Sequence, residues 1–266
     1  MNKKRLDLLL VEQGLSPSRE KAQALIIAGL VKVNGQIITK AGTPVNPDSI
    51  LTIDQPFPYV SRAGAKLARA LEAFPIQVKG VIALDIGSST GGFTDCLLQA
   101  GASKVYAVDV NIKQLDWKVA HDPRVQAIEK NARYLEPSDL PEIPQLVVMD
   151  VSFISILKIL PAVQKIIKKG DLIVLIKPQF EASRNQVGKK GIIRNKETHR
   201  RVLEQVLEGV EAIGFKVQGL LPSPILGQKG NQEFLVWLKP AAEGLIQLDF
   251  KKLIQEILAN GNEEQD

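Results

Sequence analysis

The chain has 266 residues, of which 45% are hydrophobic and 24% charged, and its formal net charge is +5. This apolar fraction predicts a globular protein with one large domain and a small one. A single cysteine, Cys96, excludes an intramolecular disulfide, and no run approaches the roughly 18 apolar residues of a membrane span. Because the basic start lacks the apolar core of a signal peptide, we expect a cytoplasmic protein.

The positive charge suits a polyanionic partner, and it is concentrated in one part of the chain. Between Lys165 and Arg201 there are eleven basic residues against three acidic ones. From Ala241 onward the chain instead carries six acids against two lysines, so we do not expect that end to bind nucleic acid.

The first 55 residues have the pattern of a small α+β domain. Apolar residues at helical spacing over 6–13 predict a short amphipathic helix, and Ser16-Pro17 starts a second helix that runs to about Ala28. The dipeptide Asn34-Gly35 lies between β-prone residues and predicts a two-residue hairpin. A strand over 49–53 completes this domain, which spans residues 1–55.

The domain resembles the small RNA-binding module that is named after ribosomal protein S-four and also occurs in pseudouridine synthases. The matching segments are Arg5-Leu6-Asp7, Ser18-Arg19-Glu20-Lys21-Ala22 and Ile27-Ala28-Gly29-Leu30-Val31-Lys32-Val33-Asn34-Gly35. The resemblance implies that basic side chains of the second helix and the strand entry contact RNA phosphates. These side chains are Arg5, Arg19, Lys21 and Lys32. The alternative is a small domain with an ordinary solvated charged face.

A connector punctuated by proline, Gln55–Val60, marks the end of this domain, because residues before proline avoid the helical region. We place the linker at 56–63 and a second domain at 64–240, which a helical stretch over 61–71 introduces. Residues 241–266 form a C-terminal helix and an acidic tail. The helix has apolar residues at near-helical spacing over 244–258, so we expect it to pack on the sheet.

A strand, a glycine-rich turn and a helix open the second domain. The apolar run 81–84 predicts a buried strand, and the segment from Phe93 to Ala100 has helical spacing and ends at Gly101. Between them the sequence reads Asp-x-Gly-x-x-x-Gly-Gly, which differs from the Gly-x-Gly-x-x-Gly of dinucleotide sites. Glycines in this turn let backbone amides approach an anionic group, so the turn is a candidate cofactor cradle.

Two carboxylates end neighbouring strands around this turn. Asp85 ends the first strand, and Asp109 ends the next one 18 positions beyond Gly91, about where a nucleotide-binding unit places its ribose-binding acid. Asp85 with the loop amides could hold the amino-acid part of S-adenosylmethionine, and Asp109 could accept its ribose hydroxyls. The cofactor-binding candidates are Asp85, Gly87, Ser88, Ser89, Gly91, Gly92, Phe93, Asp109 and, for adenine, Asn131. Alternatively, the glycine turn is one of the many found in α/β proteins, and Asp109 merely caps a helix.

Strands and helices alternate through the rest of the domain. We expect strands at 104–109, 124–129, 145–153, 172–176, 216–221 and 233–238, and helices at 156–169 and 197–213. This alternation predicts an α/β fold with a doubly wound, mostly parallel, Rossmann-like sheet, whose ligands gather at the C-terminal edges of the strands.

Four charged residues are expected at or beside this edge. Asp150 ends one strand, Lys177 ends another, Glu233 opens the last strand, and Lys66 lies on the helix that leads into the fold. A lysine after a buried strand either reaches solvent or pairs with acids in a cleft, and Asp150 on an adjacent strand favours the cleft. The order Lys, Asp, Lys, Glu resembles the catalytic tetrad of the FtsJ-type ribose 2′-O-methyltransferases.

Together with the N-terminal module, the resemblance narrows to the haemolysin-A-like (TlyA) family of ribosomal RNA methyltransferases, and it covers the chain to about Pro240. The motifs that carry it are Ser61-Arg62-Ala63-Gly64-Ala65-Lys66-Leu67, Asp85-Ile86-Gly87-Ser88-Ser89-Thr90-Gly91-Gly92-Phe93, Asp150-Val151-Ser152-Phe153-Ile154-Ser155, Lys177-Pro178-Gln179-Phe180-Glu181 and Gln232-Glu233-Phe234. The family implies S-adenosylmethionine-dependent methylation of cytidine 2′-oxygens in the ribosomal RNA of ribosomal subunits. Related enzymes often have an acid at the position of Asn131.

The chemistry of such a reaction suits these residues. A ribose hydroxyl is a poor nucleophile and a methyl sulfonium is a good electrophile, so the enzyme must align the two and manage one proton, for which no metal is needed. We expect Lys177 at the 2′-oxygen, either as a neutral base or as a cation that stabilises the developing alkoxide. Lys66 disfavours a charge on Lys177, whereas Asp150 and Glu233 favour it, and the sequence leaves both roles open.

A basic segment after Lys177 is expected to lie over the cleft and to bind substrate phosphates. The RNA-binding candidates of the second domain are Arg62, Arg184, Lys189, Lys190 and Arg194. The alternative is a solvated loop.

Three other functions are less compatible with the sequence. A methyltransferase acting on a base nitrogen usually needs an Asp/Asn-Pro-Pro-Tyr/Phe loop, and the segment from Asp150 to Phe153 lacks both prolines. A non-enzymatic ribosome-binding factor has no need for the four charged residues together. A pore-forming toxin needs membrane-active stretches, which we do not find. The oligomeric state is not predicted.

Overall fold

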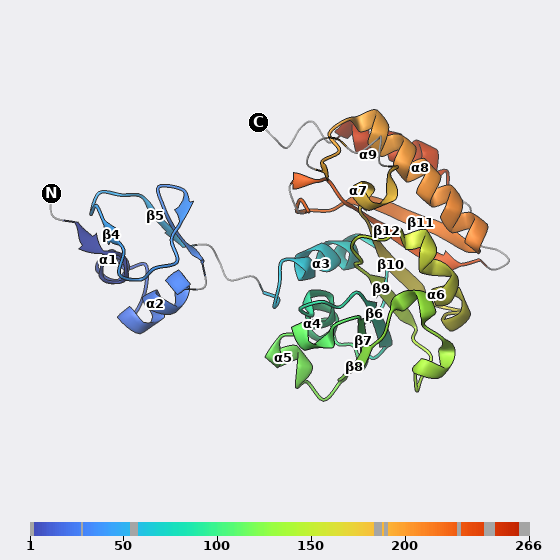
Figure 1. The fold of residues 1–266 in the computed structure, drawn as a ribbon, viewed down its shortest axis with the longest axis horizontal. Helices are drawn as coiled ribbons and strands as arrows, with labels where there is room; N and C mark the ends of the chain where they lie inside the picture. The colour runs from blue at the N-terminus through green and yellow to red at the C-terminus, as the bar shows by residue number, and fades with distance from the viewer. Residues whose placement is uncertain are drawn as a thin grey trace. The chain divides into compact units, whose positions relative to one another are not determined.

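The computed structural model describes residues 3–27, 29–53, 58–183, 188, 191–227, 230–241 and 248–260. They belong to two compact units, Met1–Phe57 and Pro58–Asp266, which we describe separately (Figure 1). The division between the units falls within the proline-punctuated connector over 55–60.

The N-terminal unit combines two adjacent helices with short strands. Its elements are β1 (Lys4–Arg5), α1 (Leu6–Glu12), α2 (Arg19–Ile27), β2 (Val31–Val33), β3 (Gln36–Ile37), β4 (Pro44–Val45) and β5 (Leu51–Ile53). Strand β2 pairs with β3 and β5 in an antiparallel sheet, and β1 pairs with β4. The turn between β2 and β3 has positive φ angles, 49° at Asn34 and 82° at Gly35, which confirms the predicted Asn-Gly hairpin.

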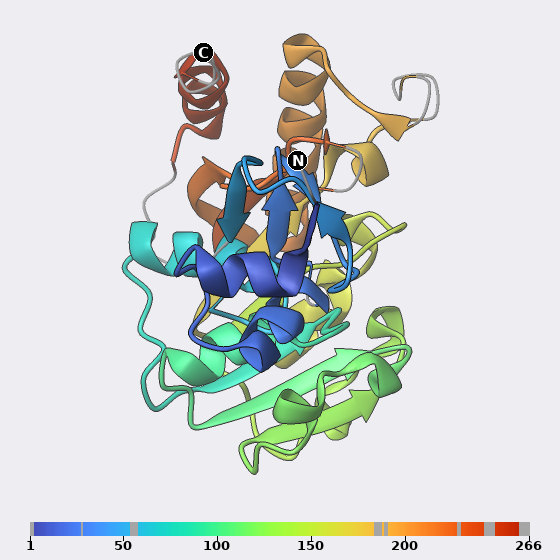
Figure 2. The ribbon, with the colours of Figure 1, turned by 90° about the vertical axis from the view of Figure 1, so that its left-hand side faces the viewer.

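Helices α1 and α2 lie side by side in this unit (Figure 2). Their apolar residues meet those of the strands in a common core, and Leu6, Leu10, Ala22, Ile26 and Val31 are fully buried there. Helices this short are marginal in isolation, so the shared core stabilises them.

The larger unit is built on one seven-stranded sheet with the order β11-β12-β10-β9-β6-β7-β8. The strands are β6 (Ile82–Ile86), β7 (Lys104–Asp109), β8 (Val125–Glu129), β9 (Leu146–Met149), β10 (Asp171–Ile176), β11 (Phe215–Pro222) and β12 (Phe234–Pro240). Strands β6 to β10 are parallel, and β12 runs antiparallel to both β10 and β11. The mostly parallel, doubly wound sheet that the sequence predicts is therefore confirmed.

Helices cover both faces of this sheet (Figure 1). One face packs against α3 (Ala63–Ala73) and α4 (Gly92–Gln99), and the other packs against α6 (Leu160–Ile166), α8 (Lys196–Ile213) and α9 (Phe250–Asn260). Because both faces are buried, the central strands read as continuous apolar runs. Short helices α5 (Trp117–Ala120) and α7 (Pro178–Glu181) follow β7 and β10.

The register of the sheet brings the ends of three strands together. In the β10–β12 pair Ile176 lies opposite Phe234, so Lys177 and Glu233 are neighbours just beyond the ladder. Strand β9 lies between β6 and β10, and the Asp150 amide donates to the Ile86 carbonyl at 3.0 Å. The C-terminal edge of β6, β9 and β10 is therefore where charged side chains converge.

The structure differs from the predicted elements mainly in helix lengths. The helix expected over 156–169 is a 3₁₀ turn, Ile156–Lys158, followed by α6, which has Pro161 in its first turn. A proline is tolerated at that place and not in a helix interior, so a new helix begins there. Of the helix expected over 244–258, residues 244–247 lie outside the described residues; the described helix, α9, begins at Phe250 and packs on α8 and β11, as predicted. Within the described residues, no helix has the length and apolarity to cross a membrane.

Residues 58–60 are held by the larger unit. The Gln99 amide donates to the Pro58 carbonyl at 2.8 Å, and the Val60 amide donates to Asp95 at 2.9 Å. The Tyr59 ring lies so close to Gly64 that a Cβ there would be 2.3 Å from the ring. These contacts fasten the start of the unit to α3 and α4.

Candidate active site

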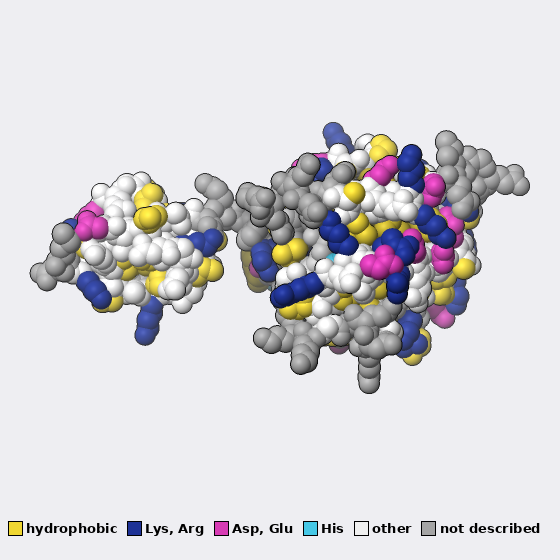
Figure 3. Space-filling view, turned by 90° about the horizontal axis from the view of Figure 1, so that it is seen from above, with side chains coloured by type: hydrophobic (Ala, Val, Ile, Leu, Met, Phe, Trp, Pro, Cys, Tyr) yellow, Lys and Arg dark blue, Asp and Glu magenta, His cyan; other side chains and the backbone are white. Residues whose placement is uncertain are grey.

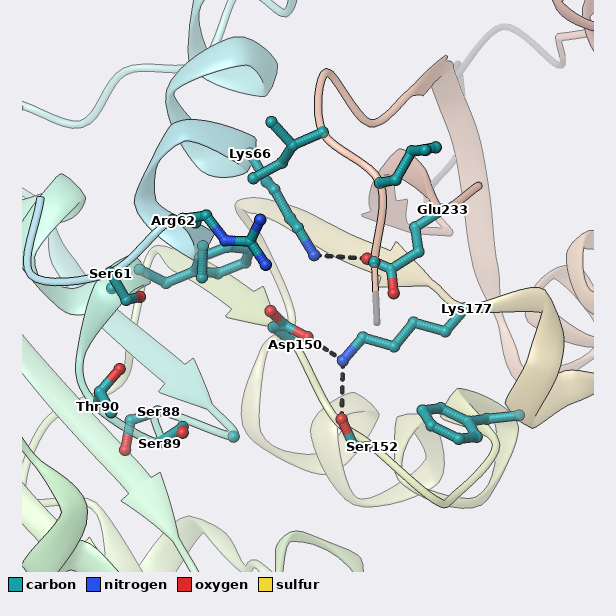
Figure 4. A pocket seen from close by; sticks show the side chains of 18 of the residues that line it. Ser61, Arg62, Lys66, Ser88, Ser89, Thr90, Asp150, Ser152, Lys177 and Glu233 are labelled. Carbon is teal, nitrogen blue, oxygen red and sulfur yellow. Dashed lines mark hydrogen bonds and ion pairs between the residues drawn. The ribbon is translucent and has the colours of Figure 1, made fainter. Parts of the chain in front are cut away.

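A pocket of about 300 Å³ opens at the C-terminal edge of β6, β9 and β10. Figure 4 shows side chains from the glycine-rich loop, the start of α3, the ends of β9 and β10, and the turn before β12 around it. Lys66, Asp150, Lys177 and Glu233 all line this pocket. The structure thus brings together the four residues that were predicted as catalytic.

Lys177 occupies the N-cap position of α7, directly after the buried strand β10. Its Nζ lies 2.6 Å from Oδ1 of Asp150 and donates a hydrogen bond to Oγ of Ser152 at 2.9 Å. Pro178 opens α7, so the strand ends at Ile176 and Lys177 lies between the two elements. Because the lysine is only 9% exposed, these two partners compensate the loss of water around its ammonium group.

Lys66 and Glu233 form a second ion pair in the pocket, above Asp150 and the Lys177 nitrogen in the view of Figure 4. Nζ of Lys66 donates to Oε2 of Glu233 at 2.5 Å, and both side chains are buried. The other carboxylate oxygen accepts from the Gln179 amide at 3.3 Å. Each charge of these two pairs therefore has a partner of opposite sign, and the Arg62 guanidinium adds a third cation to the pocket lining.

The glycines of the loop are required by close approach and by backbone conformation. Gly87 has a φ of 82°, and a Cβ there would lie 2.4 Å from the Asp150 carbonyl oxygen. Gly91 has a φ of 91° at the N-cap of α4, and a Cβ on Gly92 would lie 2.2 Å from Oγ of Ser61. The loop can therefore press against β9 and α3, which leaves Ser88 and Ser89 at the pocket wall.

Asp85 and Asp109 accept hydrogen bonds from residues of the glycine-rich loop and the helix that follows it. Asp85 is fully buried and accepts a hydrogen bond from Oγ1 of Thr94 at 2.6 Å, and burial raises its pKa to about 7. Asp109 accepts from the amides of Ser89 and Asn111, at 2.9 and 3.0 Å. Among the described residues neither carboxylate lines the pocket itself.

Asn131 lies just beyond the end of β8, and its side chain caps a 3₁₀ turn, Ala132–Tyr134. Its Oδ1 accepts from the Arg133 amide at 3.1 Å. An aspartate would accept the same bond, so this cap does not explain the asparagine, and the adenine contact stays a prediction.

The loop region fits a polar ligand such as S-adenosylmethionine. Oγ of Ser88, a residue that lines the pocket, is buried and has no hydrogen-bond partner in the described part of the chain. Buried polar atoms without partners are rare in folded proteins, so such atoms beside a pocket favour a ligand that supplies them. The positive φ angles and the start of α4 add backbone amides that suit a carboxylate.

Sequence reasoning assigned no role to several residues that line the pocket, among them Ser152 and Gln179, or to Phe153 beside it. Ser152 holds Lys177, and Phe153 has a φ of 63° with 84% of its surface exposed. The Phe153 ring lies against Phe180 with a centroid distance of 4.9 Å, and Phe180 lines the pocket. An exposed aromatic side chain in a strained conformation is unusual. In the sequence it is indistinguishable from an apolar strand residue, and the expected strand over 145–153 in fact ends at Met149.

The predicted RNA-binding residues have different surroundings. Arg5 and Arg19 are half-exposed and both pair with the buried Asp7, at 2.8 and 3.0 Å, whereas Lys21 is exposed. The hydrogen-bonded Arg5 guanidinium holds the pKa of Asp7 well below its usual value. The remaining candidates are Lys32, which is half-buried, Arg62, which lines the pocket, Arg194, which is exposed, and Arg184, Lys189 and Lys190, which lie outside the described residues.

Basic and acidic side chains are mixed on the face of the larger unit seen in Figure 3. Helix α8 contributes ion pairs of this kind, in which Arg200 pairs with Glu197 and Glu204 and Arg201 pairs with Glu197. The charges of this helix therefore largely compensate one another.

Comparison with known proteins agrees with this geometry. Residues 59–240 match the model of the FtsJ-like methyltransferases, and residues 4–51 match the S4 domain. The chain belongs to the TlyA family of FtsJ-like methyltransferases. It is an S-adenosylmethionine-dependent enzyme.

Three relatives show how far the similarity extends. The chain is 41% identical to the 16S/23S rRNA (cytidine-2′-O)-methyltransferase TlyA of Mycobacterium tuberculosis, over 88% of this chain and 89% of the relative. It is 45% identical to hemolysin A of Brachyspira hyodysenteriae, over 87% of this chain and 98% of the relative. A solved structure of a hemolysin candidate from Streptococcus thermophilus has 44% identity and a TM-score of 0.76, and the match covers 97% of this chain and 95% of that one.

Proposed function

We propose that this enzyme transfers the methyl group of S-adenosylmethionine to the 2′-oxygen of cytidine in ribosomal RNA. The observation that carries the proposal is the Lys177 ammonium, which lies in the pocket between Asp150 and Ser152 and next to the Lys66–Glu233 pair. The name of the Mycobacterium tuberculosis relative supports the choice of cytidine and of the 2′-oxygen.

S-adenosylmethionine, when bound, supplies an electrophilic methyl group. Ser88, Ser89 and the amides around Gly92 would hold its amino-acid end at the pocket wall, because the loop presents polar groups there. Asp109 would accept the ribose hydroxyls, and Asn131 lies on the side where adenine is expected. Asp85 would support the loop from beneath, since it is fully buried.

Lys177 would manage the proton of the 2′-hydroxyl. Its Nζ has two partners, Asp150 and Ser152, which orient it, and a lysine nitrogen has three such positions, so one would remain for a substrate oxygen. As a neutral amine Lys177 would take the proton, and as an ammonium it would stabilise the alkoxide. Both roles require Nζ within hydrogen-bond distance of the 2′-oxygen, and the two partners fix that position.

The exposed Phe153 suggests how the target base is held. Its ring lies beside the pocket next to Phe180, and an aromatic face stacks with a nucleobase that has left its own stack. We propose that the cytosine ring stacks on Phe153 and thereby presents its ribose to Lys177. The positive φ of Phe153 turns the side chain outward at the expense of local strain.

RNA outside the pocket would contact basic residues of both units. In the N-terminal unit these are Lys21 and Lys32, together with Arg5 and Arg19, and in the larger unit Arg194, while Arg62 would contact the RNA at the pocket itself. We also propose that Arg184, Lys189 and Lys190 contact RNA phosphates, because they belong to the basic segment that follows Lys177. The substrate would be the RNA of ribosomal subunits, and the enzyme would act in the cytoplasm.

The experiment that tests the proposal is methyl transfer from labelled S-adenosylmethionine to naked ribosomal RNA and to assembled subunits, followed by nucleoside analysis. We expect 2′-O-methylcytidine. A methyl group on a base would indicate the base-modifying alternative. Binding of the subunits without any methyl transfer would indicate a non-catalytic ribosome-binding factor.

A further inference from the structure

Glu233 reaches the pocket from a point where the sheet no longer holds it. The last pair of the β10–β12 ladder is Ile176 with Phe234, so Glu233 belongs to the turn that precedes β12. Its backbone carbonyl accepts a hydrogen bond from the Ser223 amide at 2.8 Å, and this bond joins the two ends of the turn between β11 and β12. The position of its carboxylate therefore depends on how the turn between β11 and β12 is fixed.

The backbone of Gly227 in this turn packs against the Glu233 carboxylate. A Cβ at Gly227 would lie 2.0 Å from Oε1 of Glu233, so the backbone there is in direct contact with the acid. The Gly227 amide donates to the carbonyl of Asn231 at 2.8 Å. A movement of Asn231 would therefore shift both Gly227 and the backbone of Glu233, which lies two positions later.

The Asn231 side chain ties this turn to another segment. It is only 2% exposed, its Oδ1 accepts from the Ile193 amide at 3.0 Å, and its Nδ2 donates to the Gly191 carbonyl at 3.0 Å. Ile193 is buried and precedes α8, which Asn195 caps. The side-chain amide of Asn231 thus connects the turn before β12 to the segment 191–193, which leads into α8.

We propose that Asn231 is a positioning residue for Glu233, and through it for Lys66 and Gln179, in the reaction proposed above, on which this inference rests. Asn231 is not among the described residues that line the pocket, so it acts through the carboxylate two positions later. Its role needs both a donor and an acceptor in one side chain, which alanine lacks. The Glu233 carboxylate, held against Gly227, keeps the Lys66 ammonium in one place. If the turn became mobile, the Lys66–Glu233 ion pair would be misplaced.

The test compares Asn231→Ala with Ile254→Ala in the full-length enzyme. Ile254 is fully buried in α9, on the far side of the sheet from α3 and α4, and does not line the described pocket, so its variant controls for a general loss of stability. Three quantities are measured for each variant: the single-turnover methyl-transfer rate on ribosomal RNA, the KM for RNA, and the dissociation constant of S-adenosylhomocysteine. Thermal unfolding gives the loss of stability of both.

We expect Asn231→Ala to lower the single-turnover rate about 10-fold to 100-fold, because a misplacement of about 1 Å costs that much. S-adenosylhomocysteine should bind it as it binds the wild-type enzyme. Ile254→Ala should keep the wild-type rate at a temperature where it is folded. Equal rates for the two variants would overturn the inference, as would a change in cofactor binding alone.

A second variant keeps the inference testable if Asn231→Ala does not fold. Gly227→Ala adds a methyl group where Oε1 of Glu233 now lies, so it should also lower the single-turnover rate. A wild-type rate for Gly227→Ala would contradict the positioning of Glu233 by this turn. If the wild-type enzyme itself transfers no methyl group to ribosomal RNA, the proposed function fails, which is a different result from equal variants.

Discussion

At the scale of single residues, the pocket stabilises buried charges by pairing them. Lys177 with Asp150 and Lys66 with Glu233 each form a close ion pair, and Ser152 and Gln179 supply further hydrogen bonds. Removing one partner of a buried pair is costly because the other charge is left uncompensated. The four side chains therefore act as a unit.

Asp85 predicts a pH dependence of stability. Burial raises its pKa from 3.8 to about 7, so the native state keeps a proton that the unfolded chain has released. Stability is therefore lost as the pH rises from about 4 to about 7 and is level above that range. Asp85→Asn does not titrate, and in the enzyme without cofactor it should gain up to about 4 kcal/mol relative to wild type across this range.

Denaturant unfolding of both proteins at several pH values checks this prediction. The difference between them cancels the titration of all other groups. Parallel stability curves for wild type and Asp85→Asn would show that Asp85 is already ionised in the native state.

The four charged residues were identified by their places beside strand ends or on the helix that enters the fold, together with the resemblance of their order to the tetrad of the FtsJ-type methyltransferases. Strand ends are visible in a sequence, and parallel strands place their C-terminal ends at one edge. The conformation of Phe153 was not accessible in this way. Its positive φ and its exposure result from the loop after β9, whose path is set by tertiary contacts such as the Ile156 amide donating to Glu181 at 2.8 Å.

At the scale of elements, the loop between β6 and α4 depends on two separate properties of its glycines. Gly87 needs a left-handed conformation and also a missing Cβ, because the Asp150 carbonyl is in contact with it. Gly80 has nearly the same φ, 80°, but no atom within 4 Å of the position of a Cβ. An alanine at Gly80 therefore tests the strain of the left-handed backbone alone, whereas an alanine at Gly87 tests this strain together with the clash against Asp150.

Gly80→Ala should lose only the cost of a left-handed side chain, about 1–2 kcal/mol, and keep its activity. Gly87→Ala should lose this amount and a further 1–3 kcal/mol, roughly, from the clash, and it should bind S-adenosylhomocysteine more weakly. Chemical unfolding and calorimetry measure the two effects. Equal stability and equal binding in both variants would contradict the contact with Asp150.

The elements themselves were largely predictable from the sequence. Apolar runs over 81–84 and 172–176 correspond to buried strands, and Asn34-Gly35 specifies its hairpin through positive φ angles. The helix expected over 156–169 was too long, because apolar periodicity continues through Pro161 although the helix must restart there. The antiparallel course of β12 could not be read from its sequence, since an apolar strand has the same pattern in both directions.

At the scale of the whole molecule, the two units carry different tasks. All described residues that line the pocket belong to the larger unit, and the N-terminal unit has its own core and matches the S4 domain. In that unit Arg5 and Arg19 neutralise Asp7, whereas Lys21 is exposed. A substitution in this unit can therefore weaken RNA binding in two ways, by removing a contact with RNA or by destabilising the unit. Lys21 and Arg19 distinguish the two.

Lys21→Ala should weaken RNA binding at all sequences and lower the slope of log K against log salt by about 1, with no change in unfolding. Arg19→Ala should weaken binding as well and should also destabilise the unit, because Asp7 loses a partner. Salt-dependent binding and thermal unfolding test the difference. Wild-type RNA affinity in Lys21→Ala would remove that lysine from the proposed interface.

The most direct test of the account is the single-turnover rate of Lys177→Ala on ribosomal RNA, beside the exposed-surface control Lys168→Ala. We expect Lys177→Ala to lose about 100-fold to 10,000-fold in rate while it still binds S-adenosylhomocysteine, because it lacks the group that handles the 2′-hydroxyl proton. Lys168→Ala should form 2′-O-methylcytidine at the wild-type rate. A folded Lys177→Ala enzyme that makes the same product as fast as wild type would contradict the central claim.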